Sequence, residues 1–302
     1  MQATDRPGLL AFYAEPAVMT SAGRYAYLFD GLPRDIAGLT AIGHGLLIHE
    51  FMVKGYGVTL SEADRATVHD RRVERLLAQI VARDNRPLDV AREPAGRLAA
   101  NCRHFTVLMA AMLRAQGVPA RARCGFGTYF GSGVNEDHWV CEYWNAGRDR
   151  WVLVDAQIDE RQRGWFPIDF DVTDVPRDRF LAGGQAWQQC RSGAADPGTF
   201  GLSLVNETGD WWVASNLMRD AMALLNLEVL PWDDWGAMPG PGKPIDAEMA
   251  DLLDRLAALT IEPEASLAEL EQLCYTDDRI RIPGAVHNYA RDRYENLFAL
   301  TG

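Results

Sequence analysis

The clearest amphipathic pattern in the chain lies between residues 101 and 116. Its apolar residues recur at spacings of three and four, as expected for one buried helix face: Phe105, Leu108, Met109, Met112 and Leu113. Asn101 is a good N-cap, and Gly117 followed by Val118 and Pro119 is a strong stop signal. The pattern predicts a core helix whose first residue is Cys102.

Three stretches after this helix are rich in aromatic and β-branched residues and are separated by Gly-rich or polar turns. They are residues 120–130, 138–144 and 150–158, and their composition predicts three strands. The predicted order is therefore a helix followed by an antiparallel meander. The two carboxylates in the turn before the second strand, Glu136 and Asp137, are expected at the surface.

The flanking parts of the chain read mainly as helix. Apolar spacing predicts helices over 37–53 and 61–83, with Ser61 as the N-cap of the second, and over 216–230, 245–260 and 265–274. Scattered Gly, Pro and Asp predict loops over 159–210. The expected fold class is α+β. The chain divides into a helical N-terminal region (1–95), a core (96–185) and a mainly helical C-terminal region (186–302), and these three parts can also form one compact unit.

Composition restricts the class of partner. The chain of 302 residues has 48% hydrophobic and 24% charged residues, as expected for a globular protein, and its net charge of -12 argues against binding nucleic acid or an anionic membrane. A small-molecule or peptide substrate is the expected partner, and the oligomeric state is left open. Because the start has no signal-peptide pattern and no run of about eighteen apolar residues occurs, we expect a cytoplasmic protein.

The five cysteines are scattered and odd in number, which predicts reduced thiols. No CxxC pair occurs, and Cys102 and His104, two positions apart on a helix, point in different directions, so no metal site is expected. A thiol at a helix N-terminus, however, feels the positive end of the helix dipole and ionises more readily. Cys102 is therefore a candidate nucleophile.

A thiolate nucleophile needs a base that returns a proton to the leaving group, and the base needs a group that orients it. His138 begins one predicted strand and Asp155 lies on the next. With a two-residue loop at Ala146 and Gly147, His138 stands opposite Asp155; with a four-residue loop the two become diagonal neighbours on the same face. Either loop predicts a histidine–carboxylate pair.

These residues resemble a known family. The run CRHFTVLMAAMLRAQGVPARARCGF, then DHWVCEYW, then WVLVDAQ is similar to the transglutaminase-like superfamily over about 60 residues, from Asn101 to about Ile158. The resemblance implies a papain-like core in which Cys102 is the nucleophile, His138 the general base and acid, and Asp155 the orienting carboxylate. No cofactor is expected from the sequence, and calcium, which some relatives use, has no recognisable acidic loop in this chain.

The activity that the resemblance implies is cysteine-dependent acyl transfer from an amide or ester carbonyl, through an acyl-thioester, to water or to an amine. Asp155 is followed by Ala156 and Gln157 where relatives commonly have Pro and Thr, so subfamily and substrate stay open. The backbone N–H of Cys102 is one expected oxyanion donor, and the second is not assigned, with Asn85 and Tyr56 as candidates. The alternative is a non-catalytic binding or scaffold protein that keeps the same fold.

Overall fold

The computed structural model of the protein describes residues 6–299, which form two compact units. We call residues 6–122 and 139–176 the cysteine unit, and residues 123–138 and 177–299 the C-terminal unit. Strands β3 (Ala120–Gly127) and β4 (Asn135–Asn145) each run from one unit into the other. The three-part division drawn from the sequence stays a prediction.

Helix α5 is the central element of the cysteine unit. It spans Cys102–Ala115, as the apolar spacing predicts, and its residues from Cys102 to Arg114 are all buried. The surrounding helices and 3-10 turns are α1 (Arg6–Ala14), η1 (Gly23–Phe29), α2 (Ile36–Leu46), η2 (Val53–Tyr56), α3 (Glu62–Ala66), η3 (Thr67–His69), α4 (Val73–Arg83), η4 (Pro94–Gly96) and α6 (Glu160–Arg163). The apolar faces of η1, α2 and α4, together with one face of the strands, enclose Phe105, Leu108 and Met112 in a single core. Burial of this face holds α5 in place.

The predicted helix over 37–53 is wrong in its second half. Helix α2 ends at Leu46, and the next three residues form strand β1 (Leu47–His49), which pairs in parallel with β2 (Leu98–Ala100). A short apolar run fits a buried strand as well as a helix. Here the pairing partner, about fifty residues away in the chain, decides for the strand.

The predicted helix over 61–83 is present as two shorter pieces. Ser61 is the N-cap of α3, as predicted, and forms a reciprocal capping box with Asp64. A 3-10 turn and an extended segment at 70–72 then separate α3 from α4. This break lets Thr67 donate its hydroxyl to the carbonyl of Ala99 on β2, 2.7 Å away.

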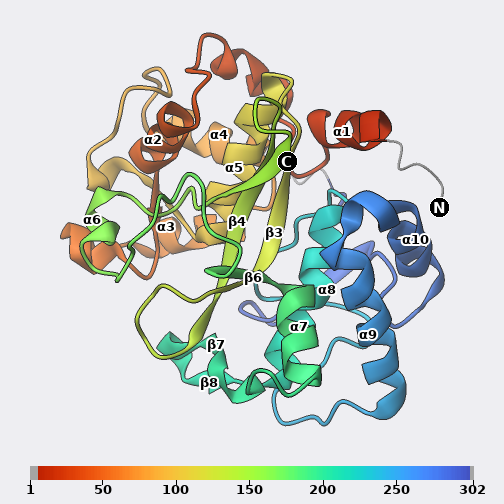
Figure 1. Ribbon diagram of the computed structural model, residues 1–302. Coiled ribbons are helices and arrows are strands. Elements are labelled where there is room, and N and C mark those ends of the chain that lie inside the picture. Colours follow the sequence, from red (N-terminus) through yellow and green to blue (C-terminus); the bar gives the residue numbers. More distant parts are fainter. Residues whose placement is uncertain (1–5, 300–302) are drawn as a thin grey trace. The chain divides into compact units, whose positions relative to one another are not determined.

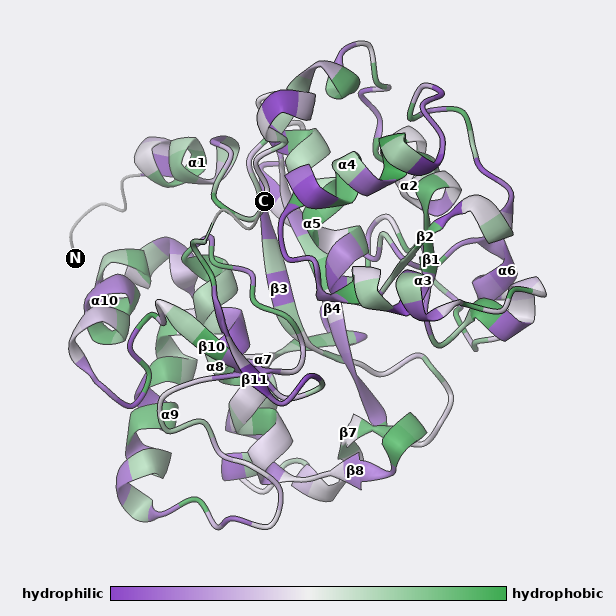
Figure 2. Cartoon of the chain, turned by 180° about the vertical axis from the view of Figure 1, so that it is seen from behind, coloured by the Kyte–Doolittle hydropathy of each residue, from purple (hydrophilic) through white to green (hydrophobic). Residues whose placement is uncertain are grey.

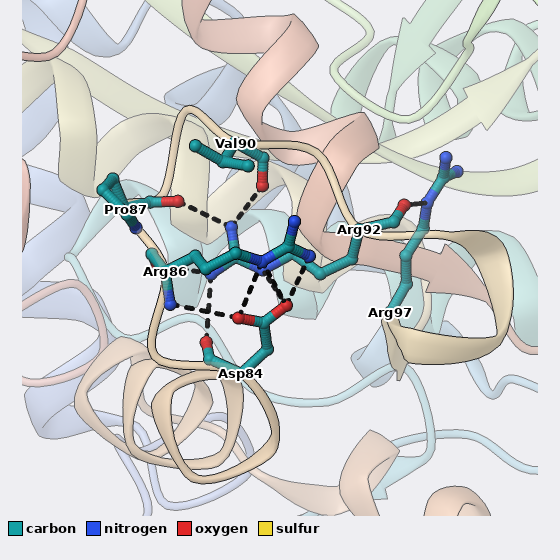
Figure 3. A network of polar contacts seen from close by, with 6 residues as sticks. All are labelled: Asp84, Arg86, Pro87, Val90, Arg92 and Arg97. Atoms are coloured by element: carbon teal, nitrogen blue, oxygen red, sulfur yellow. Dashed lines mark hydrogen bonds and ion pairs between the residues drawn. The ribbon is translucent and has the colours of Figure 1, made fainter.

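A buried arginine organises the loop between α4 and β2 (Figure 3). The guanidinium of Arg92 donates to the carbonyls of Pro87 (2.7 Å), Arg86 (2.6 Å), Asp84 (3.0 Å) and Val90. Because carbonyls turned inward in a loop need donors, this single side chain fixes the loop that leads to β2 and Cys102.

Strands β3, β4 and β5 (Arg150–Val154) follow α5, as predicted. The strand order of their sheet in the described residues is β6-β3-β4-β7-β8, with β5 paired to β4. β4 and β5 are antiparallel with Asn145 opposite Arg150 and Cys141 opposite Val154. Within the cysteine unit, a buried ion pair joins Arg121 of β3 to Glu142 of β4 (2.6 Å) on the face away from α5.

The C-terminal unit contains three helices that pack on one another (Figure 1). They are α7 (Gly183–Arg191), α8 (Asp210–Leu224) and α9 (Ala247–Ile261), followed by α10 (Pro263–Thr276). The unit also has β6 (Phe180–Ala182), η5 (Pro197–Thr199), β7 (Phe200–Leu202), η6 (Ser203–Val205), β8 (Glu207–Thr208) and the antiparallel strands β9 (Asp233–Asp234), β10 (Ala285–Asn288) and β11 (Arg293–Asn296). In residues 6–299, no helix has the length and apolarity that a membrane crossing needs.

The prediction of loops over 159–210 misses helix α7. That helix begins with Gly183 and Gly184, which are poor helix formers. A Cβ on Gly183 would lie 2.6 Å from the backbone of Leu217 on α8. The glycines are therefore present for close packing between two helices, a requirement that local sequence does not display.

Candidate active site

Cys102 is the first residue of α5, and Asn101 is its N-cap, as predicted. Cys102 is 8% exposed. Within residues 6–299 its backbone N–H has no acceptor, because the first N–H groups of a helix have no partner inside the helix. The thiol therefore sits beside an unused donor at the positive end of a 14-residue helix.

His104 stabilises the start of α5. Its Nε2 lies 3.0 Å from the carbonyl of Asp70, and its Nδ1 accepts from the backbone N–H of Asn101 at 3.2 Å. Burial, with a smaller effect from Arg103, lowers the pKa of His104 well below its usual range. The ring is therefore neutral and has a capping role.

The parallel pair of β1 and β2 leads directly to Cys102. The N–H of Glu50, the residue after β1, donates to the carbonyl of Ala100 at 2.8 Å, so that Glu50 stands beside Asn101. Its Oε1 is buried and has no hydrogen-bond partner among the described residues. Burial raises the pKa of Glu50 to about 7, although Arg65 opposes the shift. Sequence reasoning missed this residue; the signal was one acidic residue inside the apolar run LLIHEFMV.

The pairing of β4 with β5 determines on which strand face His138 and Asp155 lie. The loop has four residues, 146–149, so that the second of the two loop alternatives is correct. Continued by one step beyond Cys141 and Val154, the register sets Val140 opposite Asp155. His138 is two residues from Val140 on β4 and has the same strand parity, so it shares that face. His138 is the last residue of its segment in the C-terminal unit, whereas Cys102 and Asp155 belong to the cysteine unit.

Asp155 is fully buried, and hydrogen bonds fix both its side chain and its backbone. Its Oδ1 accepts from the N–H of Gln157 at 3.0 Å, and its own N–H donates to Val172 at 2.8 Å. The side chain of Gln157 donates to Gln162 (3.2 Å), whose amide donates to the Tyr56 hydroxyl (2.9 Å). A chain of hydrogen bonds thus connects the turn at Asp155 with η2.

Tyr56 is not available as an oxyanion donor. Its one hydroxyl proton is donated to Asp159, 2.6 Å away. Burial raises the pKa of this hydroxyl, and the bond to Asp159 raises it further. Asn85 lies on the exposed part of the loop after α4. The structure therefore supports neither Tyr56 nor Asn85 as the second oxyanion donor.

His44 lies near two carboxylates within the cysteine unit. His44, in the last turn of α2, hydrogen-bonds the carbonyl of Ala156 and feels the charges of Asp159 and Asp155. Burial nevertheless lowers the pKa of His44. Its Nε2 is buried and has no partner among the described residues. This neutral ring therefore lies near Asp155 without being charged by it.

His138 lies among aromatic rings of the C-terminal unit. The rings of Phe130 and Tyr129 meet it edge-on, with centroids 5.0 Å and 6.1 Å away. Residues Asn135–His138 are all hydrophilic, and that end of β4 is purple in Figure 2. The predicted surface position of the preceding carboxylates is wrong. Glu136 is 7% exposed and accepts from the N–H of Ser203, and Asp137 accepts from Asn216; burial raises the pKa of Asp137.

No group of three or more His, Cys, Asp or Glu side chains within the described part of the chain is arranged to hold a metal ion. No disulfide joins Cys102, Cys124, Cys141, Cys190 or Cys274 in the described residues. The cysteine unit thus contains a thiol at a helix start and a buried carboxylate, Asp155, and the C-terminal unit contains the buried His138.

Comparison with known proteins gives one family and one structure. Residues 65–156 match the sequence model of the transglutaminase-like superfamily. A solved structure titled "a Putative Cysteine Protease from Cytophaga hutchinsonii" is similar with 16% identity and a TM-score of 0.34, over 60% of this chain and 48% of that one. This chain thus spans about half of the length of that structure. None of the curated proteins matches significantly.

The family match covers all three candidate residues. It ends one residue after Asp155 and includes Cys102 and His138. At the general level it supports a cysteine-dependent enzyme with a mixed helix and sheet fold. Residues 65–156 thus form a transglutaminase-like segment, and the family resemblance seen in the sequence is confirmed.

Proposed function

We propose that the protein is an acyl-transfer enzyme that uses Cys102 as its nucleophile on an amide or ester carbonyl. The observation that carries the proposal is the position of Cys102 as the first residue of α5, beside its own unpaired N–H, inside the transglutaminase-like segment. A helix start favours the thiolate, and the N–H is a ready donor for an oxyanion.

His138 is the proposed base and acid, and Asp155 its orienting carboxylate. The common strand face that the β4–β5 register gives them supports this pairing. His138 takes the thiol proton, and the thiolate sulfur adds to the carbonyl carbon. The histidine then returns the proton to the leaving amine or alcohol, which leaves an acyl-thioester on Cys102. Water or an amine attacks this thioester with His138 as base and restores the thiol.

The first experiment measures alkylation of every cysteine by iodoacetamide across pH, by peptide mass spectrometry. Two internal controls exist, because burial raises the pKa of Cys190 to about 11 and that of Cys274 to about 12. We expect Cys102 to react fastest at neutral pH, and His138→Ala to slow it. Equal, slow reaction of Cys102 and Cys190 in both proteins would instead support the non-catalytic alternative.

A second experiment separates hydrolysis from transfer. The acyl adduct on Cys102 is formed with 4-nitrophenyl acetate and followed with and without glycine methyl ester. Faster loss of the adduct with appearance of the acetylated amine indicates transfer. Loss at a rate independent of the amine indicates hydrolysis.

A further inference from the structure

Asn216 is a buried amide of the C-terminal unit that joins two neighbouring strands, β3 and β4. It lies in the middle of α8 and is 0% exposed. Its Nδ2 donates to the carbonyl of Gly125 on β3 at 3.0 Å and to Oδ1 of Asp137 on β4 at 2.9 Å. The residue after Asp137 is His138, the proposed base. One side chain of α8 therefore connects β3 to the residue just before the base.

A guanidinium fixes the orientation of this amide. Oδ1 of Asn216 accepts from Arg219, one turn further along α8, at 3.1 Å. Arg219 is itself buried and donates also to the carbonyl of Asp233 at 3.3 Å. Because a guanidinium can only donate, Oδ1 and Nδ2 of the amide cannot exchange places. Both side-chain hydrogens of Asn216 and its oxygen thus have partners.

The same end of β4 is also held on its other face. Side chains alternate along a strand, so Asp137 points to α8, whereas Glu136 and His138 share the opposite face. The side chain of Glu136 accepts from the N–H of Ser203 at 2.9 Å, and its backbone pairs with Gly201 of β7. Hydrogen bonds from both faces therefore fix the two residues that precede His138.

Strand β3 leads to the rings that contact the imidazole of His138. Tyr129 and Phe130 follow β3, and their ring centroids lie 6.1 Å and 5.0 Å from that of His138. The bond from Asn216 to Gly125 is made on this strand. The amide thus links the strand that carries the base with the strand that carries its packing partners.

We propose that Asn216 is a positioning residue that orients His138 through its hydrogen bonds to β3 and β4. The inference rests on the proposed acyl transfer, in which His138 returns a proton to the leaving group. A group with this task must be held within about 0.5 Å of its productive position, and a misplacement of about 1 Å can cost about 100-fold in rate. Asn216 itself takes no part in the bonds that form and break.

The test compares two leaving groups on one acyl group, in the full chain at neutral pH. Phenyl acetate and 4-nitrophenyl acetate give the same acyl-thioester on Cys102, but phenolate is the more basic leaving group and depends more on a proton from His138. First-turnover release of phenol and of 4-nitrophenol is measured by chromatography, and the release by Cys102→Ala is subtracted. The ratio of the phenyl to the nitrophenyl rate cancels the thiolate fraction and the oxyanion donors, which both reactions share. It therefore reports proton transfer by His138.

Asn216→Ala should lower this ratio by about 10- to 100-fold. Asp137→Ala removes the same bond from the strand side and leaves the rest of the Asn216 network in place, so it should lower the ratio in the same direction and decides the matter if Asn216→Ala does not fold. Asp137→Asn keeps an acceptor oxygen for Asn216 and should therefore retain the wild-type ratio.

A matched control and a double variant separate positioning from stability. Ser215 is also buried in α8, but its hydroxyl donates to the carbonyls of Trp211 and Pro239, so Ser215→Ala should keep the wild-type ratio. In a His138→Ala background, Asn216→Ala should change neither rate by more than about twofold, because no base remains to be positioned. A purely structural role would lower both rates there as well.

Three results would overturn the positioning role. The first is a ratio within about twofold of the wild type in Asp137→Ala or in folded Asn216→Ala. The second is a loss in Asp137→Asn as large as in Asp137→Ala, which would assign the effect to the charge of Asp137 and not to the bond. The third is an equal effect of Asn216→Ala with and without His138. If the wild type releases phenol no faster than Cys102→Ala, the proposed function itself fails, and this inference fails with it.

Discussion

Glu50 should make the stability of the protein depend on pH in a way that one substitution removes. Burial raises the pKa of this carboxyl from the ordinary value of 4.5 to about 7 in the folded protein. Between these two values the folded state keeps a proton that the unfolded chain has released. Stability from this group is therefore fully present below about pH 4.5 and is lost as the pH rises through about 7.

The magnitude follows from the size of that difference. About 2.5 pH units at about 1.4 kcal/mol each give a loss of roughly 3 kcal/mol by pH 8, as an upper value because part of the carboxyl reaches water. Glu50→Gln cannot ionise. Relative to the wild type, the variant should therefore become more stable by about 2–3 kcal/mol between pH 4.5 and pH 8.

The assay is urea unfolding followed by tryptophan fluorescence at pH 4.5, 6, 7 and 8, with the exposed Glu62→Gln as control. The chain has nine tryptophans, and its two compact units can unfold in separate steps. Amide hydrogen exchange in the peptide covering 47–56 therefore assigns the step that responds. A wild-type and Glu50→Gln difference that does not change with pH would refute the reasoning, because it would mean that Glu50 titrates normally in the folded protein.

Three further substitutions test other parts of the fold, the first two by denaturant unfolding and the third by amide hydrogen exchange. Arg92→Met removes the donor shared by the loop carbonyls and should cost about 3 kcal/mol or more; a loss under about 1 kcal/mol would mean that water replaces the guanidinium. Glu142→Gln leaves the buried guanidinium of Arg121 without its carboxylate and should cost about 3–5 kcal/mol, whereas a neutral result would contradict their pairing. Gly125→Ala puts a Cβ 2.1 Å from the carbonyl of Leu181 and should break the pairing of β3 with β6, visible as faster amide exchange in 180–182 but not in 150–154.

Local signals were sufficient to predict helix α5 and the thiol at its start. The N-cap Asn101, the apolar spacing and the Gly117 stop are all read within one short segment, and each helix end depends on its own neighbours. The common face of His138 and Asp155 was predictable for a related reason. Strand parity is preserved by any even change of the loop, so that the two loop lengths considered led to the same face.

Features that depend on distant partners were not predictable. Residues 47–49 form a strand because residues 98–100 lie beside them. Glycine occupies position 183, at the start of α7, because the backbone of Leu217 leaves no room for a Cβ. Glu50, an acidic residue predicted on a helix, instead follows the end of β1, where its N–H donates to the carbonyl of Ala100.

The departure from the family pattern after Asp155 also has a structural explanation. Where relatives commonly have Pro and Thr, this chain has Ala156, whose carbonyl binds His44, and Gln157, whose amide donates to Gln162. Gln162 in turn donates to Tyr56 on η2, outside the matched segment. The segment after Asp155 is therefore supported by contacts to elements outside the matched residues. The family match therefore covers Cys102, His138 and Asp155 but does not cover His44 or Gln162, which support the segment after Asp155.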